Sequence, residues 1–438
     1  FVTFQYVPGP ATGFKAIRKV PPAHTLTFEK GVARLTRYWR PSCAPRLNIG
    51  FEEAVREAEE RLTQAVRKRL MSEVPLGAFL SGGVDSSLVV ALMAKFGKVK
   101  TFSIGFEEGD YNELPHARAV AQRLGTEHHE FVVKPHAAEV LPMLVRHYGA
   151  PYADSSALPT YYLAKMTRAH VTVALNGDGG DEVFAGYDRY RAIGYFKAAR
   201  HFAALAPLTG LASRIPQLPL RARRALAAIG RDPREAYGRL MSYFSPEDQR
   251  ALLSEDFLRE QGDEGPYAAL FGALDESKEP AGVRAFQYAD LMTYLPGDIL
   301  AKVDIATMAN SLEGRSPLLD HELIEWALRL PEEVTATRSE GKRILKAIAR
   351  KHVPSHVIDR PKKGFGIPIH DWFRGELAPM SRDLLLSPQA RGRGLFKAAV
   401  VERLLNEHAA GRESHGFRLW SLLCLELWFR EVVEARPV

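Results

Sequence analysis

The stretch "PLGAFLSGGVDSSLVVALM" at residues 75–93 joins two apolar runs through a pair of adjacent glycines, Gly82 and Gly83. This order predicts a buried strand, a tight turn and a helix, which is the beginning of a β–α–β unit. Glycines expose backbone N–H groups and a helix N-terminus adds positive potential, so the turn suits a phosphate. The same residues also fit a plain tight turn in which Asp85 or Ser86 caps the helix.

Strand-like and helix-like segments alternate on both sides of this turn. The predicted strands are 75–80, 99–106, 128–133 and 171–176, and the predicted helices are 51–72, 86–97, 111–125, 137–149 and 158–170. We expect Gly97 and Gly125 to end the helices that they close. The alternation predicts an α/β fold with a doubly wound parallel sheet and helices on both faces. In such sheets, ligands bind outside the carboxyl ends of the strands.

The strand signal nearly vanishes after about residue 193, so the C-terminal half is predicted to be mostly helical. At the other end, residues 1–42 contain short β-type runs interrupted by prolines and glycines. We therefore divide the chain into a β-rich segment, 1–42, and a main unit, 50–438, with an α/β part (50–192) and a helical part (193–438). Because the chain opens with Phe1 in β-type sequence, we expect it to begin inside a domain.

A second glycine-rich turn, "NGDGGDE" at 176–182, follows the last predicted strand and precedes a helix-like run at 183–190. Two such turns in one parallel sheet lie at the same edge, so their carboxylates are expected to converge on one pocket. These carboxylates belong to Asp85, Asp178, Asp181 and Glu182. Their chemistry indicates Mg²⁺, which bridges acidic side chains and nucleotide phosphates. Neither GxxxxGK[ST] nor a GxGxxG that follows a strand and opens a helix occurs, so a Walker loop is not expected.

The turn "SGGVDSS" at 81–87 resembles the pyrophosphate loop of the ATP pyrophosphatases, which adenylate a carboxylate. Other stretches resemble, in the same order, the synthetase domain of the glutamine-hydrolysing asparagine synthetases: "YNELPHARAVAQRLGTEHHE", "YADSSALPTYYLAKM", "NGDGGDEVFAGYDRY", "LPGDILAKVDIATMANSLEGRSPLLD" and "GKRILKAIARK". The resemblance covers residues 50 to about 375 and implies an adenine nucleotide alpha hydrolase-like fold. Residues 1–42 resemble the C-terminal end of that family's glutaminase domain.

The resemblance implies roles for individual residues. The ATP phosphates would be held by the first turn, namely Ser81, Gly82, Gly83, Asp85 and Ser86. The nucleotide would be lined by Leu80, Ile104, Asn176 and Gly177. Asp85 and Asp181 would bind Mg²⁺, and Asp178 matches the acidic position associated with forming β-aspartyl-AMP. Glu182 belongs to the same catalytic turn, and Lys342 matches a lysine that faces the phosphates.

Three features also have a chemical interpretation of their own. Attack of a carboxylate on an α-phosphorus puts negative charge on the departing pyrophosphate, and Lys342 is a movable point charge that suits this leaving group. Arg315 in "EGRSP" suits a bidentate clamp on a carboxylate or phosphate, and equally a structural ion pair. The segment "RPKKGFGIP" at 360–368 has the composition of a closing loop, and also that of a plain surface loop.

The resemblance implies a carbon–nitrogen ligase with glutamine as amido donor, in which a glutaminase domain that is mostly absent here delivers ammonia. It would use ATP and Mg²⁺ to convert L-aspartate into L-asparagine, with AMP and pyrophosphate as the other products. The family commonly has Ser at the position of Asn176 and differs from this chain at Gly314 and Ser316, and some relatives close β-lactams or lasso peptides. A synthetase for another carboxylate therefore stays open. The lactam-forming branch has Tyr at the position of Asp178, so the acidic residue favours amidation. A nucleotide-binding regulatory domain is a third reading, which the joint presence of the acidic residues and the lysine argues against.

Composition narrows the class of protein further. The 438 residues are 46% hydrophobic and 25% charged, as in globular proteins. The net charge of +7 is spread over 59 basic and 52 acidic residues without a long run of one sign, so nucleic acid is not a predicted partner. No apolar stretch reaches the roughly 18 residues of a membrane-spanning helix. The expected partners are small molecules, and the oligomeric state is open, with a homodimer among the options.

The chain has two cysteines, Cys43 and Cys424, which lie far apart and form no zinc-binding pattern. This usage fits a reducing compartment and predicts a cytoplasmic protein. Glutamine-dependent relatives release ammonia with a cysteine at the N-terminus, and neither cysteine here is placed for that role. We therefore expect ammonia, but not glutamine, to support amide formation by this chain.

Overall fold

The computed structural model describes residues 1–106, 113–134, 136–199, 206–212, 215, 218, 220–260, 265–360 and 366–434, so much of the expected closing loop lies outside the described residues. The first half contains β1 His24–Glu29, β2 Val32–Arg37, α1 Phe51–Arg69, β3 Leu76–Phe79, α2 Val84–Met93, β4 Lys100–Phe106, α3 Leu114–Leu124, β5 Glu127–Val133, α4 Ala137–Tyr148, α5 Ala157–Arg168, β6 Val173–Leu175, α6 Gly180–Val183 and α7 Asp188–Ala199. The second half contains α8 Ala206–Ala212, α9 Leu220–Ala228, α10 Pro233–Met241, α11 Pro246–Leu252, α12 Glu255–Glu260, α13 Ala268–Ser277, α14 Val283–Met292, η3 Leu295–Ile299, α15 Leu300–Met308, β7 Glu313–Arg315, η4 Pro317–Leu319, α16 His321–Leu328, α17 Glu332–Thr335, α18 Arg343–Ala349, α19 Ser355–Ile358, α20 Ile369–Trp372, α21 Leu377–Leu385, α22 Pro388–Gly392, α23 Ala398–Ala409, α24 Gly416–Trp428 and η5 Phe429–Val433.

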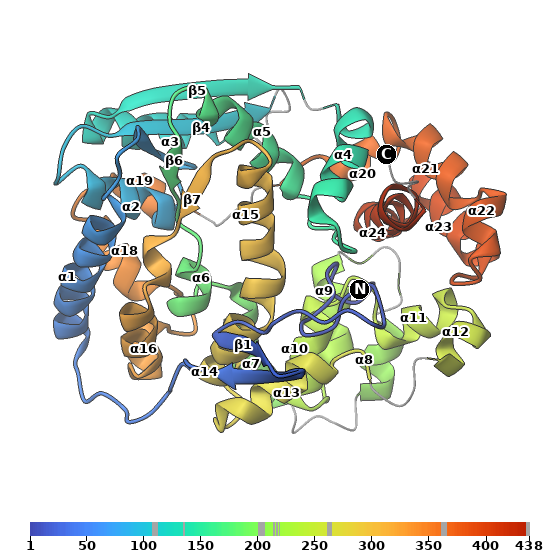
Figure 1. The fold of residues 1–438 in the computed structure, drawn as a ribbon. Coiled ribbons are helices and arrows are strands. Elements are labelled where there is room, and N and C mark those ends of the chain that lie inside the picture. The colour runs from blue at the N-terminus through green and yellow to red at the C-terminus, as the bar shows by residue number, and fades with distance from the viewer. Residues whose placement is uncertain are drawn as a thin grey trace.

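The central sheet is parallel and has the strand order β5-β4-β3-β6-β7 (Figure 1). From β3 the chain moves outward to β4 and β5, and then returns to the other side of β3 to form β6. The direction of winding therefore reverses between β3 and β6. In open α/β sheets, this reversal point opens the crevice in which ligands bind.

Alternate side chains of the strands enter different apolar clusters. Val173 and Leu175 of β6 pack in the cluster that contains the buried faces of α1, α2 and α18. Ala174, which lies between them, packs with Leu163 of α5 in another cluster. Since successive side chains of a strand point to opposite faces, helices cover both faces of the sheet. The predicted α/β class is therefore confirmed, as is the largely helical second half.

The described element boundaries agree with the sequence predictions to within about three residues, with two larger differences. Gly125 ends α3 in the left-handed conformation, as expected. However, α2 ends at Met93 rather than near Gly97, because the backbone after it tightens into a turn. The helix predicted at 183–190 is wrong, since α6 and α7 are separate. Ala185 between them has φ 53°, and a left-handed residue interrupts a right-handed helix.

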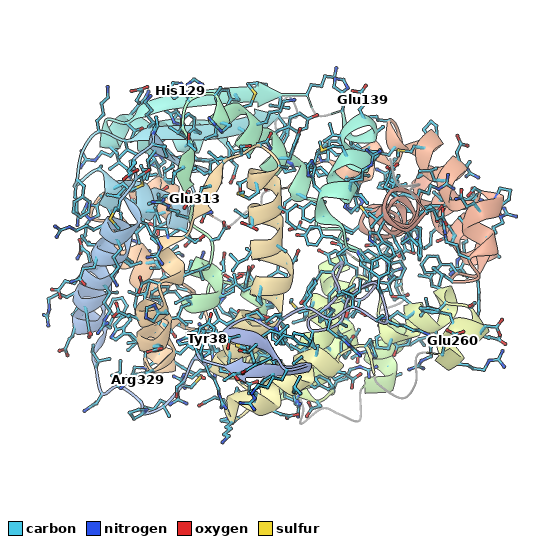
Figure 2. The ribbon with its side chains drawn as sticks, in the orientation of Figure 1. Tyr38, His129, Glu139, Glu260, Glu313 and Arg329 are labelled. Carbon is cyan, nitrogen blue, oxygen red and sulfur yellow. The ribbon has the colours of Figure 1, made fainter. Side chains whose placement is uncertain are left out.

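The N-terminal segment has an exposed part and a buried part. In the antiparallel hairpin β1–β2, the apolar side chains of Leu26 and Phe28 are exposed, and so is Tyr38 after it (Figure 2). In contrast, Tyr6 is buried and forms a β-bridge with Tyr152. That this segment is the end of a glutaminase domain, and that the domain boundaries fall at 42, 50 and 192, stay predictions.

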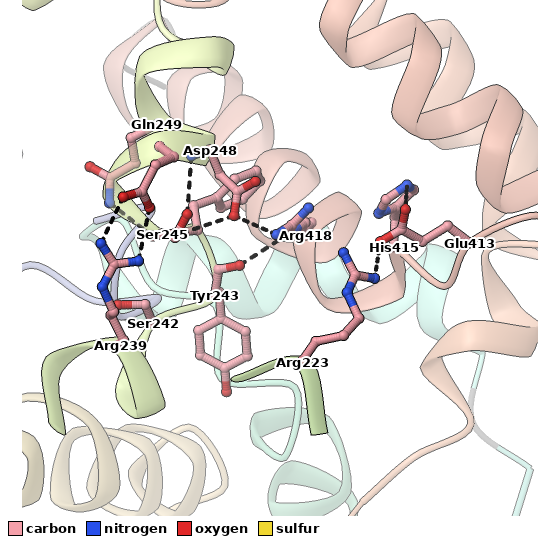
Figure 3. A network of polar contacts seen from close by, with 12 residues as sticks. Arg223, Arg239, Ser242, Tyr243, Ser245, Asp248, Gln249, Glu413, His415 and Arg418 are labelled. Carbon is pink, nitrogen blue, oxygen red and sulfur yellow. Dashed lines mark hydrogen bonds and ion pairs between the residues drawn. The ribbon is translucent and has the colours of Figure 1, made fainter. Parts of the chain in front are cut away.

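Ion pairs connect the elements of the helical part (Figure 3). Arg239 of α10 binds the Glu247 carboxylate with two guanidinium nitrogens, at 2.9 and 2.7 Å. Arg418 of α24 reaches Asp248 of α11 at 2.5 Å. The first contact joins two consecutive helices, and the second joins residues 170 positions apart. None of the described helices is both long and apolar enough to cross a membrane.

Candidate active site

The turn between β3 and α2 is shaped by close packing. Gly82 has φ +70°, and a Cβ atom there would lie 2.7 Å from the backbone of α3, so the position requires glycine. Ser81 Oγ lies 3.0 Å from Ser86 Oγ and accepts a hydrogen bond from the Gly83 N–H at 3.2 Å. These bonds fix the turn at the N-terminus of α2, and the first turn of that helix carries Asp85.

The turn between β6 and α6 lies directly against the first turn. A Cβ atom on Gly177 would lie 2.8 Å from Asp85 Cβ, and one on Gly180 would lie 2.5 Å from Asp85 Oδ1. Asn176 Oδ1 accepts a hydrogen bond from the Asp178 N–H at 3.2 Å, which folds the turn back on itself. Glycines at these positions therefore allow the two turns to touch at one edge of the sheet.

Lys342 reaches both turns from the N-terminus of α18. Its Nζ lies 2.9 Å from Asp181 Oδ1 and also pairs with Asp85 Oδ2, and only 8% of its side chain is exposed. The Lys342 N–H donates to the Phe184 carbonyl oxygen at 3.1 Å, and the residue has φ 54°. Such a conformation is strained for a residue other than glycine and persists because its surroundings hold it. Gly186 is part of these surroundings, since a Cβ atom there would lie 2.2 Å from Lys342 Cε.

Two acids of the second turn have unusual proton affinities. Burial raises the pKa of Asp178 to about 6, although the charge of Lys302 opposes this rise. Burial also raises the pKa of Glu182 to about 7, and the neighbouring charge of Asp181 adds to the rise. Tyr187 OH donates a hydrogen bond to Glu182 Oε1 at 2.6 Å. Both acids therefore exchange protons nearer to neutral pH than ordinary carboxyls do.

The donor set fits both Mg²⁺ and a polyphosphate. Mg²⁺ binds carboxylate oxygens, and the carboxylates of Asp85 and Asp181 meet beside the glycine turns. Burial alone would lower the pKa of Lys342, but the charges of Asp181 and Asp85 outweigh it and raise this pKa above its ordinary value. The lysine is therefore a permanent cation at neutral pH. A cation beside a helix N-terminus suits the phosphates of a nucleotide.

Three other residues predicted for the site, Leu80, Ile104 and Arg315, have contacts that fit a role in the fold. Leu80 and Ile104 are buried in the two apolar clusters on opposite faces of the sheet. Arg315 Nε donates to Glu313 Oε1 at 2.6 Å, and its Nη1 donates to two backbone carbonyl oxygens at the end of α1 and just after it. Figure 2 shows Glu313 on β7, at the edge of the sheet. Of the two roles left open for Arg315, the structure contains the ion pair, which Arg315 forms with Glu313.

A second buried lysine was not singled out from the sequence. Lys302 of α15 has 11% of its side chain exposed, and its Nζ lies 3.0 Å from Asp154 Oδ2. Asp154 also accepts a hydrogen bond from Ser156 Oγ at 2.8 Å. Nearby, Tyr152 OH donates to Asp298 Oδ1 at 2.7 Å. The available signal was a single lysine within the apolar run "DILAKVDIATM", where a charge is rarely buried unless it is paired.

The chain is similar to asparagine synthetases over most of its length. The family model described as asparagine synthase matches residues 57–430. The glutamine-hydrolysing asparagine synthetase 1 of Bacillus subtilis (strain 168) is 30% identical, over 100% of this chain and 68% of that protein. A putative glutamine-hydrolysing asparagine synthetase of Mycobacterium tuberculosis (strain H37Rv) is 34% identical, over 99% of this chain and 67% of that protein. A protein named amidase chyE from Penicillium rubens is 25% identical, over 93% and 67% of the two chains.

Proposed function

Because the chain belongs to the asparagine synthase family, we propose that it converts L-aspartate, ATP and ammonia into L-asparagine, AMP and pyrophosphate. Membership makes it an amide-forming carbon–nitrogen ligase. The observation that carries the proposal is the contact of Lys342 with Asp85 and Asp181 at the reversal point of the sheet. Activation of the phosphoanhydride of ATP requires a cation near the phosphates. The chain has no Walker lysine, and we assign this role to Lys342 at the N-terminus of α18.

The first step is adenylation of the acceptor. An oxygen of the aspartate β-carboxylate attacks the α-phosphorus of ATP, and the bond from that phosphorus to pyrophosphate breaks. Negative charge grows on the leaving pyrophosphate, and the buried cation of Lys342 stabilises it. The N-terminus of α2 adds positive potential on the same side. Asp85 and Asp181 would hold Mg²⁺, which supplies further charge neutralisation.

The second step is attack of ammonia on the acyl carbon. A C–N bond forms, the C–O bond to AMP breaks, and the proton that leaves the nitrogen is taken up by the phosphate of the departing AMP. Water would hydrolyse the adenylate, so the site must exclude water from this intermediate. Glu182 is 1% exposed, and Gln287 Nε2 donates to the carbonyl oxygens of Glu182 and Val183 at 2.9 and 3.0 Å. We therefore assign Glu182 to positioning the second turn and to closing the site.

Ammonia rather than glutamine is the proposed nitrogen source for these 438 residues. Both cysteines are buried thiols. Burial raises the pKa of Cys43 to about 11, and burial also raises the pKa of Cys424 far above its ordinary value. A neutral thiol is a poor nucleophile, so neither side chain suits glutamine hydrolysis. We also retain the cytoplasm as the proposed compartment.

Phosphorus NMR of the protein with ATP, Mg²⁺, ammonia and a panel of carboxylates tests the proposal. We expect AMP and pyrophosphate in step with asparagine when aspartate is present. Asp181→Asn should abolish turnover, whereas Asp359→Asn, which alters an exposed ion pair with Arg350, should leave it unchanged. ADP and inorganic phosphate as products would refute adenylation. Amidation of a different carboxylate would keep the ligase and replace aspartate as its acceptor.

A further inference from the structure

Helix α15 passes beside the second glycine-rich turn (Figure 1). The Cβ position of Gly314 in β7 lies 3.6 Å from Val303 Cγ1 of α15 and 3.7 Å from Asn176 Nδ2. Val303 is adjacent to Lys302, and Asn176 begins the turn that carries Asp178. The charges of Lys302 and Asp178 also act on each other, each favouring the ionised form of its partner.

Lys302 is held firmly in this position. Its Nζ lies 3.0 Å from Asp154 Oδ2, and its backbone carbonyl accepts a hydrogen bond from Tyr148 OH at 3.1 Å. The Ser156 N–H and Oγ donate to the Asp154 carboxylate at 2.9 and 2.8 Å. The attraction within a buried ion pair is largely cancelled by the cost of removing both charges from water. Such a pair therefore contributes little to the stability of the fold. Its charges therefore need an explanation in terms of what they bind.

The nucleotide already has its own cation in Lys342, so a second cation serves another group. The charge of Asp178 interacts with Lys302 and also with the carboxylates that hold Lys342. Adenylation requires the reacting carboxylate beside the α-phosphorus. The remaining groups of the acceptor would then face Asp178 and Lys302. An acceptor with a second carboxylate and an ammonium group matches these two charges.

We infer that Lys302 binds the carboxylate of the acceptor that does not react, and thereby selects amino acids with two carboxylates. This inference rests on the proposed function and adds its determinant of specificity. Asp154 is the positioning residue that orients the lysine. Asp178, on the same side, complements the ammonium group of the acceptor.

The test compares two acceptors in Lys302→Met, which keeps an unbranched stem one atom shorter and removes the charge. Adenylation is measured by ATP–pyrophosphate exchange with L-aspartate and with β-alanine, which is aspartate without the α-carboxylate. A charged hydrogen bond supports a loss of about 10- to 100-fold in kcat/KM for aspartate, mostly through the KM for aspartate. For β-alanine the same substitution should cost less than about threefold, and the KM for ATP should stay within about twofold. A merely structural lysine would weaken both acceptors equally.

Matched variants complete the design. Lys302→Arg keeps the charge and should recover most of the aspartate activity, and Lys351→Met, which removes an exposed lysine paired with Glu59, should change neither acceptor. If Lys302→Met does not fold, Asp154→Asn frees the lysine and should raise the KM for aspartate but not that for β-alanine. Equal losses for the two acceptors overturn the inference and leave the proposed function intact. Wild-type protein that adenylates no aspartate refutes the proposed function first, so the two failures are distinguishable.

Discussion

Replacing Lys342 by Met should destabilise the protein as well as inactivate it. The substitution keeps the stem of the side chain but removes the cation that pairs with Asp85 and Asp181. Two largely but not fully buried carboxylates, 18% and 14% exposed, would then face each other without a countercharge. Breaking a buried pair by removing one partner costs about 3–5 kcal/mol, because the remaining charge is desolvated and unpaired.

The corresponding change in melting temperature follows from the size of the chain. The entropy of unfolding is about 2.1 cal/mol/K per residue, which is about 0.9 kcal/mol/K for 438 residues that unfold as one unit. A loss of 3–5 kcal/mol therefore lowers the melting temperature by about 3–5 °C. Lys351→Met serves as the control because this lysine is half-exposed, and its loss should shift the melting temperature by less than about 1 °C.

Calorimetry in EDTA, with and without a second substitution, measures this effect. Lys342→Met combined with Asp85→Asn should recover about 1–3 kcal/mol, since one of the two facing charges is gone. Millimolar Mg²⁺ should also raise the melting temperature of Lys342→Met, because the ion would take the place of the missing cation. Unchanged stability of Lys342→Met, or strict additivity of the two substitutions, would refute the reasoning.

Three further outcomes are expected. Gly180→Ala should abolish turnover, because its Cβ atom would lie 2.5 Å from Asp85 Oδ1, whereas Gly272→Ala in α13, with nothing within 4 Å, should retain full activity. Burial raises the pKa of Asp298 to about 8, so the protonated acid favours the folded state, and this contribution is lost as pH rises from about 4 through about 8. The melting temperature of wild-type protein should therefore fall relative to that of Asp298→Asn between pH 5 and pH 9, and parallel curves would contradict the shift. With glutamine as the sole nitrogen source, no glutamate should form, as an amino-acid analysis would show.

Local features of the structure could be predicted from the sequence, because they depend on interactions between residues that are close in the chain. The turn at Gly82 follows from glycines between two apolar runs, and alternation of segments was enough for the parallel sheet. The break at Ala185 was not predictable, since its left-handed conformation is imposed by packing around Lys342. The partners of Lys302 were also hidden, because helical periodicity shows which face is buried but not which charge lies opposite. Spacing alone gave no reason to join Lys342 to Asp85, and only the family resemblance pointed to it.

The contact of Lys342 with Asp85 spans 257 positions of the chain. Closing so long a loop costs conformational entropy that local contacts cannot recover, so the pair forms only when the sheet and the helices after it have both folded. In an intermediate with a folded sheet but an undocked α18, the glycine turns and carboxylates would lack the cation of Lys342. The proposed activation of a nucleotide would therefore require the complete fold. Under the proposed role of Lys342, a partly folded chain of this kind should not activate ATP.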